Sequence, residues 1–373
     1  MNYRTFGKLN FRPSALGFGA MRLPILDGDS KKINEPEAIR MIRAAIDSGV
    51  NYIDTAYPYH GGMSEVVVGK ALKDGYRQKT MLASKSPVFN IKKEEDFDNF
   101  LNEQLERLQE DHIDFYLLHA LDRDRWNNVV LKFNLLDKME KAKQEGKIRY
   151  IGFSFHDDFD AFKLIVDGYD KWDFCQIQMN YIDTENQAQL KGMEYAASKQ
   201  LGIVIMEPLL GGKLANPPKQ VAKVLPGDKT PVEWALDFLW NRPEVGVILS
   251  GMSTMEQVQQ NIEYASRAQV GMLSQADLDM LTEARRIFLT MALVPCTKCA
   301  YCMPCPFGLN IPKTFEAYNM TASVNMEAAR KVYDTLEVAA DQCRACKKCE
   351  KVCPQSIEVS AVMPEVAKVF QKA

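Results

Sequence analysis

The chain has 373 residues, 46% of them hydrophobic and 25% charged, and its net charge is −3. This composition is typical of an ordinary globular protein, and the length suggests two domains. The negative charge argues against nucleic acid as the main partner, and no apolar run is long enough to cross a bilayer.

Short apolar, β-branched or aromatic runs alternate with longer amphipathic stretches over about the first 290 residues. The runs predict eight strands, at Leu16–Met21, Val50–Asp54, Thr80–Lys85, Ile113–His119, Arg149–Ser154, Phe174–Met179, Ile203–Glu207 and Gly246–Ser250. The amphipathic stretches predict helices between them, including Pro36–Ser48, Glu94–Gln109, Asn128–Gln144 and Asn186–Lys199. Such alternation predicts a parallel α/β sheet, and its eightfold repeat favours a closed (β/α)8 TIM barrel over residues 1–290. The segment Tyr3–Phe11 precedes it as a small hairpin under the barrel floor.

Ionisable residues follow three consecutive predicted strands. The second strand ends in Asp54 with Tyr59 just beyond, the third ends in Lys85, and the fourth ends in His119. Each residue alone has a structural explanation, such as a capping acid or a packed aromatic ring. Because the C-terminal strand ends of a (β/α)8 barrel form its active-site face, the four together predict a catalytic site.

The family resemblance given in the next paragraph implies the reduction of a carbonyl by hydride, and in that reaction each of the four side chains has a physical role. The oxygen that becomes anionic needs a proton, and Tyr59 is the candidate acid. We expect Lys85 to lower the pKa of the Tyr59 phenol, which is ordinarily about 10, and Asp54 to keep Lys85 charged. His119 would donate a hydrogen bond to the carbonyl oxygen and orient the substrate.

These residues resemble those of the aldo-keto reductases. The matching pieces are Asp54-Thr-Ala-x-x-Tyr59, Lys85, His119, Gly152-Phe-Ser154 and Gln176-Ile, and the resemblance covers about residues 3–290. It implies an oxidoreductase that uses NAD(H) or NADP(H) on a small-molecule aldehyde, ketone or sugar-like alcohol. It assigns the same catalytic roles to the four residues.

The resemblance also indicates where the nicotinamide cofactor binds. Ser154 and Gln176 would hold the carboxamide, and Met206 stands where the family commonly stacks an aromatic ring. The family usually has Asn after the serine, where this chain has Phe155. The candidate nucleotide contacts after the last strand are Gly251, Ser253, Gln257 and Asn261. No Lys or Arg lies between residues 250 and 261 to meet a 2′-phosphate, which slightly favours NADH.

Eight of the nine cysteines lie in two runs near the C-terminus. The runs are Cys296, Cys299, Cys302 and Cys305, then Cys343, Cys346, Cys349 and Cys353, each followed by proline. The second run has the C-x2-C-x2-C-x3-C-P spacing of bacterial iron–sulfur proteins, and the first differs by one position. In two-cluster proteins the fourth cysteine of a run ligates the other cluster. We therefore predict a first [4Fe–4S] cluster on Cys296, Cys299, Cys302 and Cys353, and a second on Cys343, Cys346, Cys349 and Cys305.

A zinc site and disulfide bonds are the alternative interpretations of these cysteines. Zinc favours two separated C-x2-C pairs. Four cysteines at every third position cannot easily form a tetrahedron around one zinc ion. Disulfides suit an oxidising compartment, whereas the chain opens without an apolar signal segment, so we expect a cytoplasmic protein. Residues 291–373 are predicted to form a small α-helical ferredoxin-like domain. The resemblance extends to an iron–sulfur branch of the reductase family, found mostly in anaerobes.

The two halves predict different electron chemistry. Hydride transfer moves two electrons, while each cluster passes one at a time. A flavin is a candidate intermediary, and an external ferredoxin or flavodoxin is a candidate partner. The clusters are otherwise structural or redox-sensing. The leading hypothesis is a carbonyl–alcohol oxidoreductase coupled to two clusters. The alternative is an electron-transfer or sensing protein whose barrel binds nucleotide with little reductase activity.

Overall fold

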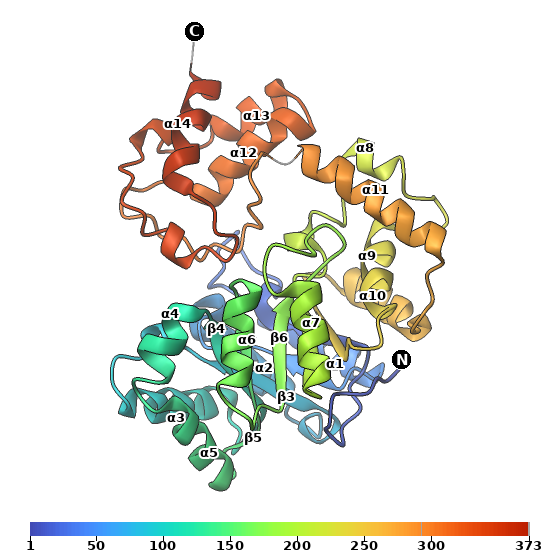
Figure 1. The fold of residues 1–373 in the computed structure, drawn as a ribbon, viewed down its shortest axis with the longest axis vertical. Coiled ribbons are helices and arrows are strands. Elements are labelled where there is room, and N and C mark those ends of the chain that lie inside the picture. Colours follow the sequence, from blue (N-terminus) through green and yellow to red (C-terminus); the bar gives the residue numbers. More distant parts are fainter. Residues whose placement is uncertain (292, 372–373) are drawn as a thin grey trace. The chain divides into compact units, whose positions relative to one another are not determined.

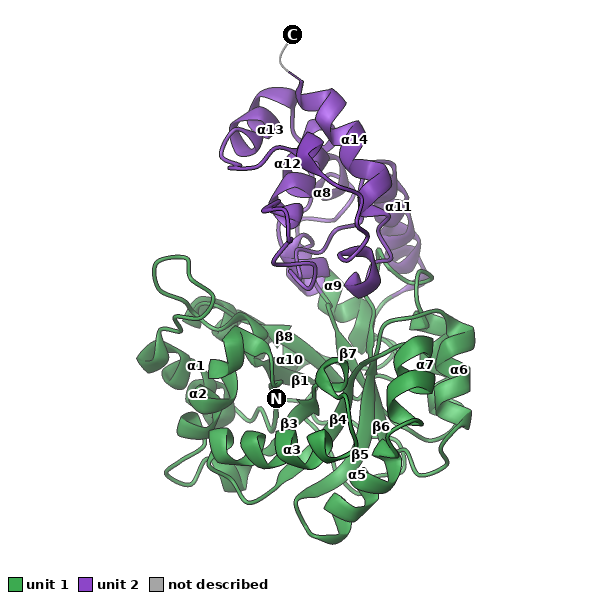
Figure 2. Cartoon of the chain, turned by 90° about the vertical axis from the view of Figure 1, so that its left-hand side faces the viewer, with its two compact units in different colours: residues 1–208, 235–273 green, residues 209–234, 274–373 purple. Residues whose placement is uncertain are grey.

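The computed structural model describes residues 1–291 and 293–371, and the chain divides into two compact units (Figure 1, Figure 2). Unit 1 comprises residues 1–208 and 235–273. Unit 2 comprises residues 209–234 and the chain from residue 274 onward. The segment 209–234 interrupts the sequence of unit 1 and belongs to unit 2. Unit 2 is therefore built from two stretches of sequence.

Unit 1 is built on a closed barrel of eight parallel strands in sequence order. The strands are β1 (Leu16–Gly19), β2 (Tyr52–Asp54), β3 (Met81–Ser86), β4 (Ile113–Leu121), β5 (Ile148–Phe155), β6 (Phe174–Gln178), β7 (Gly202–Met206) and β8 (Val247–Gly251). The barrel closes where β8 pairs with β1, from Leu16 opposite Ile248 to Gly19 opposite Gly251. Since both faces of such strands are covered, all nine residues of β4 are buried. The predicted TIM barrel is confirmed.

Helices follow the strands in unit 1, as the alternation predicts. They are α1 (Glu35–Asp47), α2 (Met63–Ala71), α3 (Glu95–Leu108), α4 (Arg123–Arg125), α5 (Leu135–Gln144), α6 (Phe159–Asp167), α7 (Gln189–Ser198) and α10 (Met255–Arg267), while α9 (Pro231–Trp240) runs from unit 2 into unit 1. The residues that α1 buries recur every three or four positions, at Ala38, Met41, Ile42 and Ala45. Its apolar stripe therefore faces the interior, which is why the sequence pattern locates the helix.

One predicted helix starts later than expected. The stretch Asn128–Gln144 is helical only from Leu135. A wider, π-type turn occupies Trp126–Val130, and Asn134 has a φ of +52°. Trp126 is buried and its ring lies 6.3 Å from that of Trp172. Packing of this large side chain anchors the turn and overrides the helical periodicity.

The N-terminal segment closes one end of the barrel. Antiparallel bridges join Phe6 to Leu9 and Tyr3 to Ser14, which confirms a hairpin. The Phe6 ring is 1% exposed and lies 5.6 Å from that of Phe115. It packs in a cluster with residues near the strand beginnings, such as Phe174 and Val247. Phe6 therefore plugs the floor, opposite the face where the strands end.

Unit 2 is helical over the residues that the structure describes. Its helices are α8 (Lys219–Ala222), α11 (Gln275–Met291), α12 (Ile311–Ser323), α13 (Met326–Tyr333) and α14 (Val359–Phe370). Its core contains Phe315, Met363 and Val366, and six of the cysteines pack against it. The expected helical cysteine-rich region is confirmed. The division into compact units places α11 in unit 2. The domain boundary at residue 290 stays a prediction.

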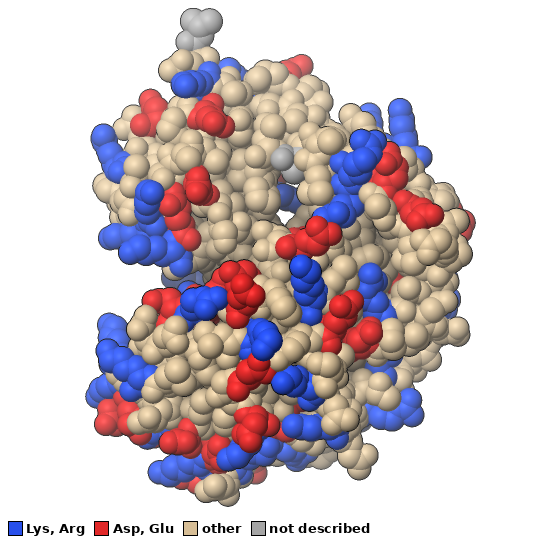
Figure 3. Space-filling view, in the orientation of Figure 1, with Lys and Arg blue, Asp and Glu red and all other residues tan. Residues whose placement is uncertain are grey.

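The surface carries charges of both signs. Acidic and basic side chains are interspersed over the face shown in Figure 3. Several are exposed ion pairs, such as Arg40 with Glu37 at 2.7 Å, which contribute little stability each. Over the two described ranges, no helix is both long and apolar enough for a bilayer span.

Candidate active site and cluster sites

Three of the predicted catalytic side chains meet where β2 and β3 end. The Lys85 Nζ lies 2.7 Å from each carboxylate oxygen of Asp54 and 3.5 Å from the Tyr59 hydroxyl. It also donates to the carbonyl oxygen of Thr55 at 2.8 Å. All of these side chains are buried. An ammonium has three N–H donors, so Asp54, Thr55 and Tyr59 account for them.

His119 joins this group from β4. Its ring centroid lies 6.1 Å from that of Tyr59, with the two rings nearly perpendicular. Burial holds the pKa of His119 well below its ordinary value, and the neighbouring Lys85, His156 and Arg125 lower it further. The imidazole is therefore neutral at neutral pH, with one N–H donor to offer.

The pKa of Tyr59 differs from our expectation. Burial raises it well above 10, and the negative charges of Asp54 and Glu207 act in the same direction. We expected Lys85 to lower it, but the Asp54 carboxylate neutralises that ammonium at 2.7 Å. The phenol therefore experiences desolvation without a net positive neighbour. Burial likewise raises the pKa of Asp54 and lowers that of Lys85. Tyr59 stays protonated at neutral pH, which is the form that a general acid requires.

A buried polar network, which sequence reasoning did not predict, contacts the backbone of Lys85. Ser84 Oγ donates to Glu65 at 2.7 Å, and Gln104 Nε2 donates to Glu65 at 2.6 Å and to the Lys85 carbonyl at 3.2 Å. Arg107 forms an ion pair with Glu65 at 3.3 Å. In the sequence, the local sign of this network is Gln104, a polar residue on the otherwise apolar face of α3. Through Gln104, the network holds the backbone of Lys85, the predicted catalytic lysine.

The residues predicted to hold the nicotinamide lie at the ends of β5, β6 and β7. Ser154 Oγ accepts a hydrogen bond from the Ala120 amide at 2.7 Å. Gln176 Nε2 lies 3.3 Å from the Met206 sulfur, and both residues belong to paired strands. Gln176 Oε1 is buried and has no partner within the described ranges. An orphaned acceptor of this kind fits an amide donor such as a carboxamide.

The residues predicted to meet the nucleotide gather where β8 ends. The Ser253 amide donates to Gln257 Oε1 at 2.8 Å. Asn261 is buried and its Nδ2 donates to Ser250 Oγ at 3.0 Å. Both contacts order the β8–α10 turn around Gly251.

The structure adds a basic residue to this nucleotide region. Ser253 Oγ donates to the carbonyl of Arg22 at 2.8 Å. A Cβ on Gly251 would lie 3.2 Å from the Arg22 side chain, so the two residues are in contact. Arg22 lies outside residues 250–261 because it follows β1, a strand that is far away in sequence but adjacent to β8 in the closed barrel.

The eight cysteines line two cavities in unit 2. One cavity is lined by Cys296, Cys299, Cys302 and Cys353, and the other by Cys305, Cys343, Cys346 and Cys349. Each set takes three cysteines from one run and the fourth from the other. Within the part of the chain that the structure describes, no three Cys, His, Asp or Glu side chains are close enough to hold a single ion. Thiols spread around a cavity fit a cubane, whose irons occupy separate corners.

The backbone explains why three cysteines of each run face one cavity. The residues on either side of Cys299, Lys298 and Ala300, have φ values of +59° and +63°. Ala345 and Lys347 flank Cys346 in the same way, with φ values of +49° and +58°. These left-handed residues curl each run around its cavity at a conformational cost, a form of strain that gathers at functional sites.

Burial favours the protonated form of two of these thiols, Cys302 and Cys349. Burial raises the pKa of Cys302 to about 12 and that of Cys349 to about 11. All nine cysteines are free of disulfides. Because thiolates are the ligands of iron, cluster assembly must displace these protons.

Comparisons with known proteins agree with this arrangement. Residues 15–285 match the model of the aldo/keto reductase family, and residues 295–357 match a 4Fe-4S dicluster domain. L-galactose dehydrogenase of Arabidopsis thaliana is 28% identical over 291 residues, which is 69% of this chain and 86% of the plant protein. The uncharacterized oxidoreductase YrpG of Bacillus subtilis is 30% identical over 58% of this chain and 69% of its own. Among solved structures, the holo form of aldo-keto reductase AKR11C1 from Bacillus halodurans has a TM-score of 0.63 and 26% identity, covering 76% of this chain and 96% of that one.

Proposed function

The chain belongs to the aldo/keto reductase family, and from this premise we propose that its barrel interconverts a carbonyl and an alcohol with NAD(H) or NADP(H). The observation that supports this most strongly is Lys85 Nζ joining Asp54 to the hydroxyl of Tyr59 in a buried site. The test is oxidation of NADH and NADPH with a panel of aldehydes, ketones and aldoses under anaerobic conditions. A hydroxylated carbonyl compound is the substrate class that we propose first, since one relative is named L-galactose dehydrogenase.

The proposed mechanism assigns one task to each catalytic side chain. When bound, the nicotinamide supplies the hydride. Tyr59, protonated at neutral pH, donates a proton to the carbonyl oxygen, and Lys85 provides its hydrogen-bonded partner at 3.5 Å. Neutral His119 donates a hydrogen bond that orients the same oxygen. Asp54 and the Thr55 carbonyl hold Lys85 in place.

The pKa of Tyr59 predicts different pH profiles for the two directions. Reduction needs the protonated phenol, and a pKa raised above 10 keeps that form abundant across neutral pH. Reduction should therefore change by less than about twofold between about pH 6 and pH 8. Oxidation of the alcohol needs the phenolate, so its rate should rise about tenfold per pH unit over the same range. Initial rates in both directions check this, and a reduction rate that falls tenfold per unit would contradict it.

We further propose that Ser154, Gln176 and Met206 hold the nicotinamide. The unpartnered Oε1 of Gln176 supports this role. The turn containing Gly251, Ser253, Gln257 and Asn261 would meet the nucleotide.

Arg22 is the basic group of this proposed nucleotide site. Replacing it by Gln should raise the dissociation constants of NADH and NADPH by about tenfold, because one charge-assisted hydrogen bond to a phosphate is lost. Fluorescence titration of both cofactors measures the change. Arg12→Gln is the matched control, since Arg12 is exposed and contacts a backbone carbonyl in the N-terminal hairpin region. Unchanged constants for both cofactors would remove Arg22 from the site.

The C-terminal region is a 4Fe-4S dicluster domain, and we propose that its two clusters are redox-active. Each bound cluster supplies one-electron transfer. An external ferredoxin or flavodoxin is the proposed electron partner, and the protein is proposed to work in the reducing cytoplasm of an anaerobe. The direct test is turnover with NADH in the presence of a viologen acceptor. The proposed function does not include a flavin bound in the barrel.

A further inference from the structure

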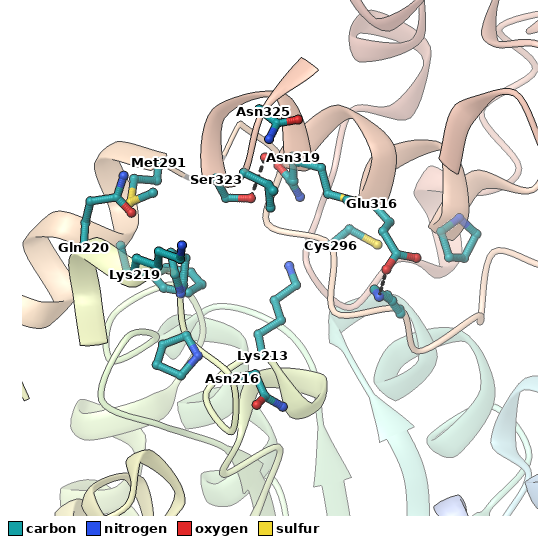
Figure 4. A pocket seen from close by; sticks show the side chains of 17 residues that line it. Lys213, Asn216, Lys219, Gln220, Met291, Cys296, Glu316, Asn319, Ser323 and Asn325 are labelled. Atoms are coloured by element: carbon teal, nitrogen blue, oxygen red, sulfur yellow. Dashed lines mark hydrogen bonds and ion pairs between the residues drawn. The ribbon is translucent and has the colours of Figure 1, made fainter. Parts of the chain in front are cut away.

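Unit 2 contains a pocket of about 510 Å³ with several polar side chains that hold the fold together (Figure 4). Asn319 accepts a hydrogen bond from the Val294 amide and donates one to the Val294 carbonyl oxygen, both at 2.8 Å. Ser323 Oγ donates to the Asn319 carbonyl oxygen at 2.9 Å, and Lys298 forms an ion pair with Glu316. These contacts stabilise unit 2, so they do not identify a ligand for the pocket.

The buried polar network around Glu65 in unit 1 differs, because it contacts residues next to the proposed catalytic side chains. Glu65 lies in the first turn of α2 and is 0% exposed. Its Oε1 accepts hydrogen bonds from Ser84 Oγ at 2.7 Å and from Gln104 Nε2 at 2.6 Å, while its Oε2 faces Arg107 at 3.3 Å. Both oxygens therefore face donors, which is the condition for keeping a carboxylate in a buried place. Burial raises the pKa of Glu65, and these contacts oppose the rise.

The network fixes the end of β3, which carries Lys85. Ser84 directly precedes Lys85 in this strand. Gln104 Nε2 lies 2.9 Å from Ser84 Oγ and 3.2 Å from the Lys85 carbonyl oxygen. The Tyr116 hydroxyl donates to Gln104 Oε1 at 2.7 Å, which leaves the amide one orientation. Glu65 and Gln104 thus hold the end of β3 from two helices, α2 and α3.

The same turn of α2 also fixes the end of β2. Ser64, the neighbour of Glu65, is buried, and its Oγ donates to the Ala20 carbonyl oxygen at 2.9 Å. The Thr55 hydroxyl lies 2.8 Å from Ser64 Oγ, and Thr55 is the donor because the single hydroxyl proton of Ser64 is already used. The Thr55 carbonyl oxygen in turn accepts the 2.8 Å hydrogen bond from Lys85 Nζ. Both strand ends that hold the lysine are therefore tied to adjacent residues of α2.

A short turn with an unusual backbone conformation joins Tyr59 to α2. His60, Gly61 and Gly62 have φ values of +53°, +66° and +95°. A left-handed conformation costs energy at a residue with a side chain, so His60 keeps it only because its surroundings hold it there. One such contact is the hydrogen bond from the Leu23 amide to His60 Nε2 at 3.2 Å. The position of Tyr59 therefore depends on the contacts that hold this turn.

Arg107 of α3 holds the turn and also contacts Glu65. A Cβ on Gly62 would lie 3.0 Å from Arg107 Nη1, so the guanidinium packs against the turn. The same Nη1 lies 3.3 Å from Glu65 Oε2 and 3.4 Å from the Tyr57 carbonyl oxygen. The guanidinium also lies over the Tyr57 ring, 4.3 Å from its centroid. Glu65 therefore links the residues behind the proposed catalytic lysine to this turn.

We propose that Glu65 is a positioning residue, which holds the Lys85 ammonium and the Tyr59 hydroxyl at their 3.5 Å contact. Its carboxylate is shared by the hydrogen bonds behind Lys85 and by the guanidinium beside the Tyr59 turn. A displacement of about 1 Å between reacting groups can lower a rate by about 100-fold. The inference rests on the proposed carbonyl reduction, in which Lys85 and Tyr59 act together.

The variant Glu65→Gln, made in the holoprotein, tests the proposal. An amide has one acceptor oxygen, so it can keep the Ser84 and Gln104 hydrogen bonds but turns an N–H toward Arg107. We expect kcat for carbonyl reduction to fall about 10- to 100-fold. The KM for the carbonyl substrate and the dissociation constants of NADH and NADPH should stay within about twofold. Steady-state rates and fluorescence titration measure these values, and an unchanged kcat or a loss carried by KM would overturn the proposal.

Glu110→Gln is the matched control. Glu110 forms an ion pair with Arg77 at the same distance of 3.3 Å, and its side chain is only 12% exposed. It lies before the start of β4, at the opposite end of the barrel from the proposed catalytic side chains. The control therefore removes a similar ion pair without touching Glu65, and its kcat should stay within about twofold of wild type. A loss equal to that of Glu65→Gln would indicate general destabilisation and would overturn the proposal.

Amide hydrogen exchange provides a readout that needs no turnover. In Glu65→Gln the backbone amides of residues 57–63 should exchange about fivefold faster than in wild type, because the turn loses its connection to α2. The same amides should be unaffected in Glu110→Gln. Unchanged exchange in Glu65→Gln would count against the proposal as firmly as an unchanged kcat. If the wild-type protein reduces no carbonyl, the proposed function fails, while this measurement still shows whether Glu65 holds the Tyr59 turn.

Arg107→Met is a second variant, for the case that Glu65→Gln does not fold. The Arg107 side chain is 22% exposed, so its replacement disturbs the core less than a change at Glu65. The variant removes the contact between Glu65 and the turn and keeps the hydrogen bonds from Ser84 and Gln104. We expect kcat to fall about tenfold with KM unchanged. A wild-type kcat in this variant would also overturn the proposal.

Discussion

Replacing Tyr59 by phenylalanine is expected to lower the rate of carbonyl reduction by about 10²- to 10⁴-fold, the contribution of a positioned general acid. The variant removes one hydroxyl and keeps the ring that packs near His119. Lys85 retains its contacts to Asp54 and to the Thr55 carbonyl, so the site should stay folded. Steady-state rates with the best carbonyl substrate measure the effect.

Measuring cofactor affinity distinguishes a general-acid role of Tyr59 from a role in binding the cofactor. In the Tyr59→Phe variant, the dissociation constants of NADH and NADPH should stay within about twofold of wild type, because the hydroxyl serves the substrate oxygen. Tyr57→Phe is the matched control two residues away. Its hydroxyl donates to Glu103 at 3.0 Å, away from Lys85, and activity should persist. Full turnover by the Tyr59 variant would remove Tyr59 from the acid role.

Exchange of the fourth cysteine between the two runs is the second prediction with a large effect. A Cys343→Ala/Cys346→Ala variant should lose the second cluster, and iron should fall from about eight to about four atoms per chain. In this background, adding Cys305→Ala should leave the iron content unchanged, because Cys305 lines the same cavity as the cysteines already removed. Adding Cys353→Ala instead should remove the remaining cluster, because Cys353 lines the other cavity.

The two triple variants are controls for each other, since each carries the same number of lost thiols. Iron and sulfide analysis counts the clusters that remain. The electron paramagnetic resonance spectrum of the reduced protein shows which variant keeps one. Ligation within each run would give the opposite pattern, with loss on Cys305→Ala and retention on Cys353→Ala. Ligand bonds to metal contribute folding energy, so loss of a cluster could also unfold unit 2. Circular dichroism reports whether the total helix content is kept in both triple variants.

The strands of the barrel were predictable because each carries a local signal. All eight predicted strands overlap observed ones, as Ile113–His119 overlaps β4. A strand buried on both faces is mainly apolar, so its composition marks it. The start of α5 was not predictable, since burial of Trp126 beside Trp172 replaces regular helix by a wider turn.

The catalytic candidates were predictable from their positions at strand ends, but their chemistry was not. The pKa of Tyr59 depends on burial and on Glu207, which lies five strands away along the chain. Arg22, Glu65 and Gln104 also reach the site from outside the predicted motif. Desolvation and charge act through space, so no sequence window contains them.

The sequence by itself determined the identity of the strands, the four residues at their ends and the eight cysteines with their spacing. These features are local, because periodicity and ligand spacing are properties of short segments. Only the tertiary structure decided which cysteines share a cavity and that Tyr59 is held protonated. Each of these depends on distances between segments that are far apart along the chain, and those distances are set by barrel closure and by the packing of unit 2.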